Sequence, residues 1–388
     1  PGAGSVLEKT LQTQSAGEKE MKYIGIVAGA KPEQATALKA ALIAKDPLVK
    51  VVIEETAMRQ DAPDERGKLA DRKIELFNAV EALAAKGVRI AAFTCACPHA
   101  WFDELAAEVS IAVVDACGAK GEPLPVEDYA EKLLSTCDAL PAKPYKVGLI
   151  GGLGPAATVD LYDKIVKATP ATTDQEHIRL VVEQNPQIPD RTKALLEGGA
   201  DPTLALYRCA KALQADGCDA VIIPCNTAHA FMPYMRRHLD VNFIDMQESC
   251  LNEIQAKFGD KARVGLMATT GTVRTGIYSK KAEAMGIPMF VPDEAHQARV
   301  MAAIYGPKGA KAGFTDGICR EDLVSAAEYL VKTYDCNVLI LGCTELPLIL
   351  DEGDFDCAGK TVYIIDPTSS LARRVVKTAL AANKERGF

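Results

Sequence analysis

Short, continuous runs of apolar residues alternate with longer amphipathic stretches along most of the chain. "YIGIVAG" (23–29) precedes "PEQATALKAALIA" (32–44), and "RIAAFTC" (89–95) precedes "PHAWFDELAAEV" (98–109). Apolar runs of this length, separated by amphipathic helices, are typical of parallel sheets that are covered by helices on both faces. The pattern therefore predicts an α/β protein.

Two kinds of predicted strand occur three times each. The opening strand recurs as "YIGIVAG" (23–29), "KVGLIGG" (146–152) and "RVGLMAT" (263–269). A strand that ends in cysteine recurs as "IAAFTC" (90–95), "AVIIPC" (220–225) and "VLILGC" (338–343). The spacing from the opening glycine to the cysteine is 70, 77 and 78 residues. A repeat of this kind predicts three related α/β lobes, each with its thiol at the carboxyl end of a parallel strand, where open α/β sheets bind their ligands.

The prolines of "LPAKPYK" (140–146) predict a linker between the first lobe and the rest. We expect residues 1–20 to form a flexible tail, since the compact pattern begins at Met21 and these residues lack the apolar core of a signal peptide. The predicted organisation is then lobe one (21–143), lobe two (144–246, completed by 366–388) and lobe three (247–365).

A gapless internal match relates lobe one to lobe two. "FTCACPHAW" (93–101) aligns with "IPCNTAHAF" (223–231) at an offset of 130 residues, and the offset still holds at "IAVVDA". It pairs Cys95 with Cys225, His99 with His229, and Asp115 with Asp245. A match of this length indicates duplication.

Composition restricts the class of protein. The 388 residues are 48% hydrophobic and carry a net charge of −8, which argues against a nucleic-acid partner. The longest apolar runs are of strand length, so we expect no membrane partner. Twelve cysteines in a long, charged chain predict free thiols in a reducing compartment, hence a cytoplasmic protein.

The turn after Cys225, in "PCNTAH", combines a thiol with groups that bind an anion. A strand is predicted to end there and a helix to begin, and a helix N-terminus favours thiolate over thiol. Asn226, Thr227 and the free backbone N–H groups of the first turn suit a carboxylate. "LGCTELPL" repeats this arrangement, with Cys343 followed by Thr344. Most other cysteines, among them Cys209, Cys218, Cys250 and Cys336, are expected to be small packing residues.

The stretch "GLIGGLGPAAT" (148–158) contains a G-x-G-x-x-A pattern after a predicted strand. It is compatible with a dinucleotide site, but Pro155 removes an N–H donor that would bind a pyrophosphate, and lobes one and three lack the pattern. A tight turn beside a small anionic ligand fits equally well.

"NPQIPDRTKALL" (185–196) brings Asp190 and Arg191 to a predicted loop-to-helix junction. Such a pair is often a helix cap plus a surface charge. Alternatively, the guanidinium binds a second carboxylate through two parallel hydrogen bonds.

The segments "GGLGPAAT", "TDQEHIRL", "NPQIPDRT", "IPCNTAHAF", "LMATTGT" and "LGCTELPL" resemble, in the same order, the cofactor-independent aspartate racemases of the aspartate/glutamate racemase superfamily. The resemblance runs from about Lys146 to the C-terminus. It implies two pseudo-symmetric lobes with the active site between them, no cofactor, no metal, and a homodimer.

The same resemblance implies a role for each candidate residue. The acid/base pair would be Cys225 and Cys343, while Asn226, Thr227 and Thr344 would hold the α-carboxylate. The side-chain carboxylate would be bound by Arg191 with Lys311, for which Lys308 is the alternative in "IYGPKGAKAG". Acidic neighbours that tune the thiols would be Asp190 and Glu345.

Lobe one lacks the residues that hold a substrate. Ala96 and Cys97 replace Asn226 and Thr227, and "APDERGK" (62–68) is only a blurred copy of "IPDRT". Metal binding by Cys95, Cys97 and His99 is disfavoured, because the spacing is not a usual zinc pattern. We therefore interpret "FTCACPHAW" as a decayed copy of the catalytic turn, now used for packing or sensing.

The predicted function is two-base racemisation of a dicarboxylic amino acid, aspartate or glutamate. Removal of the Cα proton from one face and its return to the other needs one thiolate and one thiol on opposite walls. The alternatives are other reactions of the superfamily, of hydantoin racemase or maleate isomerase type, and a non-catalytic amino-acid sensor.

Overall fold

The computed structural model describes residues 22–29, 32–56, 65–94, 99–118, 121–136 and 142–388. The predicted tail and the cysteines Cys95 and Cys97 lie outside these ranges. The chain divides into two compact units, Pro1–Lys143 and Pro144–Phe388. The first unit contains lobe one, and the second contains lobes two and three.

Lobe one is a four-stranded sheet with strand order β2-β1-β3-β4, and every recorded strand pair is parallel. Side chains alternate between its faces: Ile24 and Ile26 pack with helices α2 and α5, whereas Val27 packs with α3 and α4. The elements are β1 (Tyr23–Ala28), α2 (Pro32–Lys45), β2 (Lys50–Glu55), α3 (Glu65–Ala85), β3 (Ile90–Phe93), η1 (His99–Trp101), α4 (Phe102–Glu108), β4 (Ala112–Val114) and α5 (Val126–Ser135).

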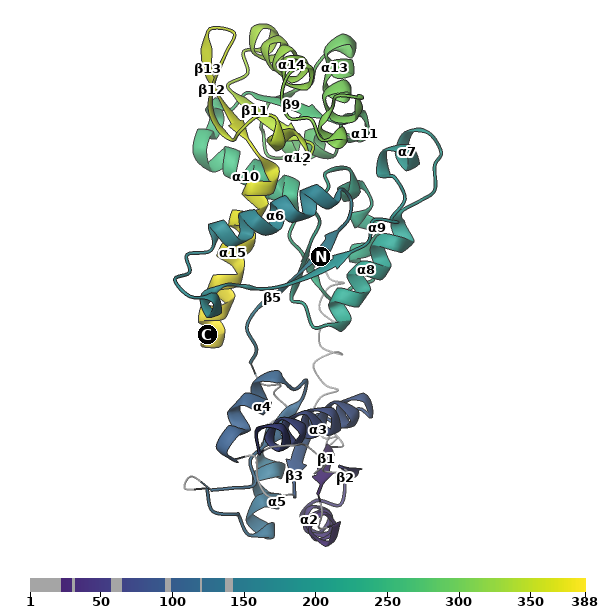
Figure 1. The fold of residues 1–388 in the computed structure, drawn as a ribbon, viewed down its shortest axis with the longest axis vertical. Helices are drawn as coiled ribbons and strands as arrows, with labels where there is room; N and C mark the ends of the chain where they lie inside the picture. The colour runs from purple at the N-terminus through teal and green to yellow at the C-terminus, as the bar shows by residue number, and fades with distance from the viewer. Residues whose placement is uncertain (1–21, 30–31, 57–64, 95–98, 119–120, 137–141) are drawn as a thin grey trace, which may run out of the picture. The chain divides into compact units, whose positions relative to one another are not determined.

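Lobe two repeats this topology in the order β6-β5-β7-β8, again with parallel pairs. Helix α8 covers one face, and α6 and α15 lie side by side on the other (Figure 1). The elements are β5 (Lys146–Gly151), α6 (Pro155–Ala168), η2 (Asp174–Glu176), β6 (Arg179–Gln184), α7 (Arg191–Leu196), α8 (Thr203–Ala215), β7 (Ala220–Ile222), η3 (Thr227–Ala230), α9 (Met232–Arg236) and β8 (Asn242–Phe243), with α15 (Pro367–Arg386) from the end of the chain.

Lobe three has the order β10-β9-β11-β13-β12. Helices α13 and α14 pack on one face of the sheet, and α10 and α12 pack on the other. The elements are α10 (Met246–Phe258), η4 (Gly259–Lys261), β9 (Val264–Ala268), α11 (Thr270–Thr275), α12 (Ile277–Ala284), β10 (Met289–Phe290), α13 (Glu294–Tyr305), η5 (Ala310–Ala312), α14 (Ile318–Tyr334), β11 (Val338–Gly342), η6 (Leu346–Leu348), β12 (Gly353–Cys357) and β13 (Lys360–Ile365).

One edge of lobe three differs from the all-parallel pattern that we expected. Strand β12 runs antiparallel to β13, and only Ala358 and Gly359 separate the two strands. Both residues have positive φ, 54° and 78°, as a tight hairpin turn requires. A connection of two residues can join only antiparallel strands, which is why this strand breaks the pattern.

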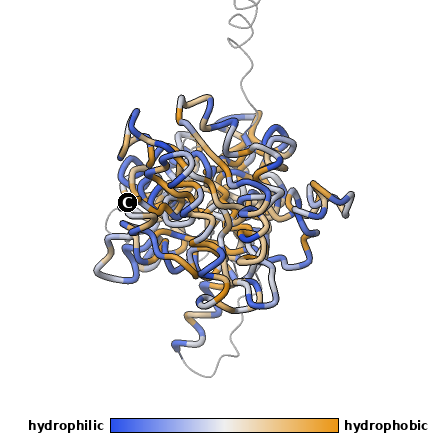
Figure 2. Tube along the Cα trace, turned by 90° about the horizontal axis from the view of Figure 1, so that it is seen from above, coloured by the Kyte–Doolittle hydropathy of each residue, from blue (hydrophilic) through white to orange (hydrophobic). Residues whose placement is uncertain are grey.

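The expected α/β fold is confirmed: the described residues form three lobes whose four parallel strands share one order, and lobe three adds the antiparallel strand β12. Figure 2 shows hydrophobic and hydrophilic stretches alternating along the trace. Within the described ranges, no helix is both long and apolar enough to span a bilayer.

Candidate active site

A pocket in the C-terminal unit lies where the cysteine-ended strands of lobes two and three stop. It encloses about 340 Å³, open solvent at its mouth included, and both Cys225 and Cys343 line it. Cys225 follows β7 and Cys343 follows β11, so each thiol is at the carboxyl end of a parallel strand. Both residues are buried.

The turn that follows Cys225 is shorter than the helix that we predicted. It is the four-residue 3₁₀ helix η3, and the five-residue helix α9 follows it. Pro233 in α9 lacks the backbone N–H that a continuous helix would need at that position, so the helix cannot run on from Thr227. The helix-dipole support for a thiolate at Cys225 is correspondingly smaller than expected, since a single turn carries little of the macrodipole.

His229 fixes the backbone of this turn. Its Nδ1 is 2.9 Å from the carbonyl oxygen of Cys225, and its Nε2 accepts a hydrogen bond of 3.2 Å from the backbone N–H of Met246. This pattern requires the neutral tautomer with the proton on Nδ1, and burial lowers the pKa of His229 in agreement. His229 therefore positions Cys225 and has no free nitrogen for a ligand.

Asn226 offers an unused donor at the pocket wall. Its Oδ1 accepts a hydrogen bond of 2.6 Å from Tyr278, which fixes the amide, whereas its buried Nδ2 has no partner within the described part of the chain. A buried donor without a partner costs free energy until a ligand supplies an acceptor. This arrangement fits the predicted role of Asn226 in binding a carboxylate.

Thr227 belongs to a cluster of hydroxyl groups that joins lobe two to lobe three. Its Oγ1 lies 3.0 Å from that of Thr272 and 3.3 Å from that of Thr269. Thr269 also lines the pocket, and its side chain caps helix α11. Sequence reasoning quoted "LMATTGT" but did not name Thr269 as a site residue.

Cys343 is held as a neutral thiol by its neighbour. Its Sγ donates a hydrogen bond of 3.0 Å to Oε2 of Glu345, and Thr344 donates to the same oxygen at 3.3 Å. Burial, and then the charge of Glu345, raise the pKa of Cys343 well above its usual value, while Lys311 opposes part of the shift. The prediction that this turn favours thiolate was therefore wrong for Cys343.

Lys311, and not Lys308, lines the pocket. The Lys311 side chain is 29% exposed and pairs with Oε1 of Glu345. Burial alone would lower its pKa, but the charge of Glu345 outweighs that effect and raises it, so the amine stays charged. Lys308 is exposed and does not line the pocket.

Tyr305 is a pocket residue that sequence reasoning missed, although it stands in the quoted segment "IYGPKGAKAG". Its ring centroid lies 5.4 Å from Nζ of Lys311. Desolvation of the hydroxyl raises the pKa of Tyr305 to about 12. Its hydroxyl is therefore a neutral hydrogen-bonding group beside the thiol.

Arg191 opens helix α7, at the junction that we predicted. Its Nη1 donates to the carbonyls of Ile188 (3.2 Å) and Pro189 (3.0 Å), and its Nη2 donates to that of Leu153 (2.8 Å). The buried Nε has no partner within the described ranges. A guanidinium has five N–H donors, so Nε–H and one hydrogen of Nη2 remain for a ligand in the pocket that Arg191 lines.

Asp190 also lines the pocket, but its recorded contact is with the backbone. It caps α7 by accepting a hydrogen bond of 2.9 Å from the N–H of Lys193. Among the described residues, no hydrogen bond or ion pair between Asp190 and a thiol is recorded. Of the two acidic residues that we predicted to tune a thiol, only Glu345 has a recorded hydrogen bond with one among the described residues.

The glycine-rich turn of lobe two lies close to lobe three. A Cβ at Gly154 would lie only 2.8 Å from Oε1 of Glu345, and a Cβ at Gly152, where φ is +89°, would lie 2.6 Å from the backbone of Asn185. These glycines therefore serve close approach of protein groups. The two contacts account for both glycines without a dinucleotide.

The fold and the two thiols of the C-terminal unit define a two-lobed α/β enzyme-like unit, in which cysteines at matched strand ends line one pocket. A family model described as Asp/Glu/Hydantoin racemase matches residues 150–375. The chain belongs to this family, in the aspartate/glutamate racemase superfamily. The match covers lobes two and three and leaves lobe one outside.

Individual proteins similar to this chain are also racemases. The broad specificity amino-acid racemase RacX of Bacillus subtilis (strain 168) is 25% identical over 250 residues, which are 61% of this chain and 98% of that protein. A glutamate racemase of Aquifex pyrophilus is 28% identical over 147 residues, 37% of this chain and 53% of that protein. The structure is similar to that of Picrophilus torridus aspartate racemase, with a TM-score of 0.51 and 31% identity, over 61% of this chain and 94% of that one.

Proposed function

We propose that lobes two and three racemise an acidic amino acid, aspartate or glutamate, without a cofactor. The observation that carries the proposal is that Cys225 and Cys343, on equivalent strand ends, line one pocket together with the cationic side chains of Arg191 and Lys311. Two thiols suit removal and return of a Cα proton, and two cations suit a substrate with two carboxylates.

The raised pKa of Cys343 and its hydrogen bond to Glu345 support a starting role for each thiol. Because its pKa is raised, Cys343 holds its proton in the resting pocket and acts as the acid. Cys225 is the base that takes the Cα proton from one face, and Cys343 delivers its own proton to the opposite face. The new thiolate at Cys343 then lies near Lys311, whose positive charge offsets it. The reverse reaction exchanges the two roles.

Donors around the thiols would hold the two carboxylates. For the α-carboxylate we propose the unpartnered Nδ2 of Asn226, with the hydroxyls of Thr227 and Thr344. For the side-chain carboxylate we propose Nε–H and the remaining Nη2 hydrogen of Arg191, with Lys311 in support. Fixed donors of this kind also stabilise the negative charge that develops as the proton leaves.

Incubation in deuterated water tests the proposal. Protein dialysed against a chelator should convert one enantiomer of aspartate or glutamate into the other, with deuterium at Cα. Cys225→Ala and Cys343→Ala should each abolish inversion, while the remaining thiol still exchanges the proton of the enantiomer that it faces. Alanine belongs among the substrates tested, because the relative RacX is named for broad specificity.

Two buried thiols outside the pocket provide matched controls. Cys209 shares a core cluster with Cys225, and Cys336 shares one with Cys343. Replacement of either control cysteine by alanine should leave turnover within a few-fold of the parent once folding is verified. Absence of exchange in the parent protein would indicate an amino-acid sensor, and dependence on added pyridoxal phosphate would contradict the thiol mechanism.

A further inference from the structure

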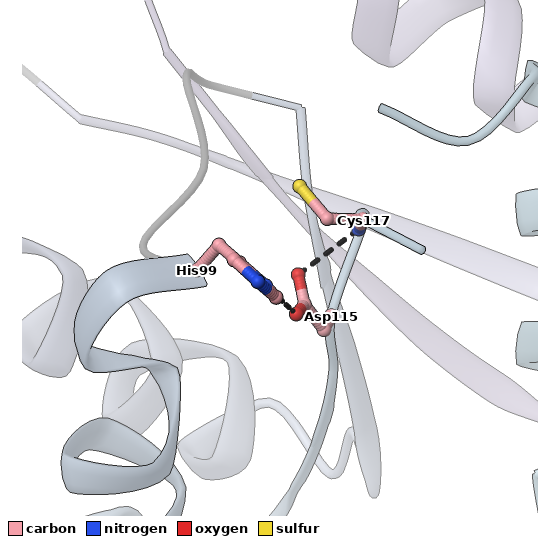
Figure 3. A group of neighbouring side chains, drawn as sticks. All are labelled: His99, Asp115 and Cys117. Atoms are coloured by element: carbon pink, nitrogen blue, oxygen red, sulfur yellow. Dashed lines mark hydrogen bonds and ion pairs between the residues drawn. The ribbon is translucent and has the colours of Figure 1, made fainter. Parts of the chain in front are cut away.

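Lobe one contains a cluster of three side chains of types that can ligate a metal ion, His99, Asp115 and Cys117 (Figure 3). His99 opens η1, while Asp115 and Cys117 follow strand β4. Nδ1 of His99 lies 2.6 Å from Oδ2 of Asp115, and Oδ1 of Asp115 accepts a hydrogen bond of 3.0 Å from the backbone N–H of Cys117. One ligand atom from each side chain lies within 4.8 Å of the other two.

Burial increases from one side of this cluster to the other. The Cys117 residue is only 5% exposed, and its free thiol has no hydrogen-bond partner within the described part of the chain. The Asp115 side chain is 16% exposed and that of His99 is 42% exposed. A soft ligand therefore lies at the inner end of the cluster, and the imidazole side is open to solvent as a route of entry.

The equivalent residues of lobe two make different contacts from those of this cluster. At the same offset of 130 residues stand His229, Asp245 and Gln247. There, backbone groups satisfy both nitrogens of the histidine, and the Asp245 carboxylate pairs with the ammonium of Lys281 at 2.5 Å. At these positions lobe two thus has a histidine with both nitrogens hydrogen-bonded, a carboxylate paired with an ammonium, and glutamine where lobe one has the Cys117 thiol. In lobe one the histidine instead contacts the carboxylate, and a cysteine stands where lobe two has glutamine.

We propose that His99, Asp115 and Cys117 bind a divalent metal ion of the zinc class. A set of one imidazole nitrogen, one carboxylate oxygen and one thiolate suits Zn²⁺, whereas Mg²⁺ and Ca²⁺ prefer oxygen ligands alone. The ion would replace the proton shared by His99 and Asp115. The Cys117 thiol would release its proton to solvent, as metal binding by cysteine requires.

The distances are compatible with closure around an ion. Ligand bonds of about 2.0–2.3 Å in a tetrahedral site place the ligand atoms about 3.3–3.7 Å apart. The contact between Nδ1 of His99 and Oδ2 of Asp115 would open from 2.6 Å, and the atoms farthest apart, within 4.8 Å, would approach by roughly 1 Å. Lys132 steadies this end of the cluster, because its Nζ donates to the backbone carbonyl of Asp115 at 3.0 Å. Water completes the coordination.

Zinc titration of the reduced full chain against a competing chelator tests this site. The background protein carries Cys225→Ser and Cys343→Ser, so that neither pocket thiol contributes, and Co²⁺ serves as the optical probe of thiolate ligation. We expect one bound ion per chain, a sulfur-to-cobalt charge-transfer band, and a melting temperature that rises with Zn²⁺. His99→Ala and Cys117→Ser should each weaken binding by more than the roughly 10–100-fold that loss of an outer-shell partner costs.

His296 provides the matched control. Its Nδ1 makes the same contact with an aspartate, 2.6 Å to Oδ1 of Asp293, and the metal-ligand cluster found in the described residues does not include it. His296→Ala should leave zinc affinity unchanged. The proposal fails if the background protein binds no zinc, if His99→Ala and Cys117→Ser bind it as tightly as the background protein, or if cobalt shows no thiolate band.

Discussion

Replacement of Arg191 by lysine should distinguish the effect of its positive charge from the effect of its guanidinium N–H donors. Lysine keeps the positive charge but has no Nε–H, the buried donor that lacks a partner in the structure. It also cannot reach three carbonyls and a ligand at once, because its ammonium has three donors at a single point. We therefore expect Arg191→Lys to impair both dicarboxylate binding and the anchoring of the loop before α7.

The two effects have different sizes. Loss of a charge-assisted contact to a carboxylate costs about 1.5–3 kcal/mol, which is roughly a 10- to 150-fold decrease in kcat/KM for aspartate or glutamate. The lost bonds to Leu153, Ile188 and Pro189 should cost about 1–2 kcal/mol in total, since Arg191 is half-buried and water replaces part of them. For a unit of this size, that lowers the melting temperature by about 2–8 °C.

The assay compares kcat/KM for the acidic amino acid with that for a neutral one, together with thermal unfolding. Arg263→Lys is the control, because Arg263 also donates to a main-chain carbonyl, that of Tyr334 at 3.0 and 2.6 Å, and does not line the pocket. It should lower the melting temperature without changing substrate preference. Should Arg191→Lys keep full activity on aspartate and glutamate, or lose activity equally on neutral and acidic substrates, the assignment of the fork to a second carboxylate is wrong.

Three further predictions concern the pocket and the buried thiols. Lys311→Met should lower kcat/KM at least tenfold, by loss of a partly buried charge-assisted contact, whereas Lys308→Met should leave it unchanged; equal effects would refute the choice of Lys311. Gly154→Ala should displace the carboxylate of Glu345 and lower turnover, with a small change in melting temperature because only the end of a flexible side chain must move; unchanged turnover would contradict this geometry. Burial raises the pKa of Cys218 to about 11 and that of Cys336 to about 12, so these thiols stay protonated in the folded state while the unfolded chain loses their protons above about pH 9. The stability is therefore fully present below pH 9 and decreases as the pH rises towards 12; a melting temperature that stays constant from pH 8 to 11 would refute this.

Much of the architecture could be predicted from the sequence. The opening strand and the cysteine-ended strand occur three times, and the three sheets built on them share one strand order. The antiparallel strand β12 was not predicted, because the two-residue turn at Ala358 and Gly359 has no strong hairpin signature such as Asn-Gly.

The candidate site was predictable where residues adjoin a repeated motif. Cys225 and Cys343 follow matched strands, and the structure brings both to one pocket. Their catalytic roles stay predictions. Tyr305 and Thr269 were missed, since each reaches the pocket from an element that carries no cysteine motif. Glu345 was named as a tuning residue, but its direct acceptance of the Cys343 thiol hydrogen depends on a side-chain conformation that spacing does not encode.

The sequence by itself determined the three α/β lobes and the strand ends on which Cys225 and Cys343 stand, because hydrophobic periodicity and duplication are properties of a one-dimensional pattern. Only the tertiary structure decided that Cys343 is a neutral thiol and that Arg191 donates three hydrogen bonds to backbone carbonyls. It also decided that His99 lies close to Asp115 and Cys117 in lobe one. These properties depend on burial and on the approach of charged and polar groups from distant segments. Desolvation and Coulomb interactions act through space, so no local pattern of residues specifies them.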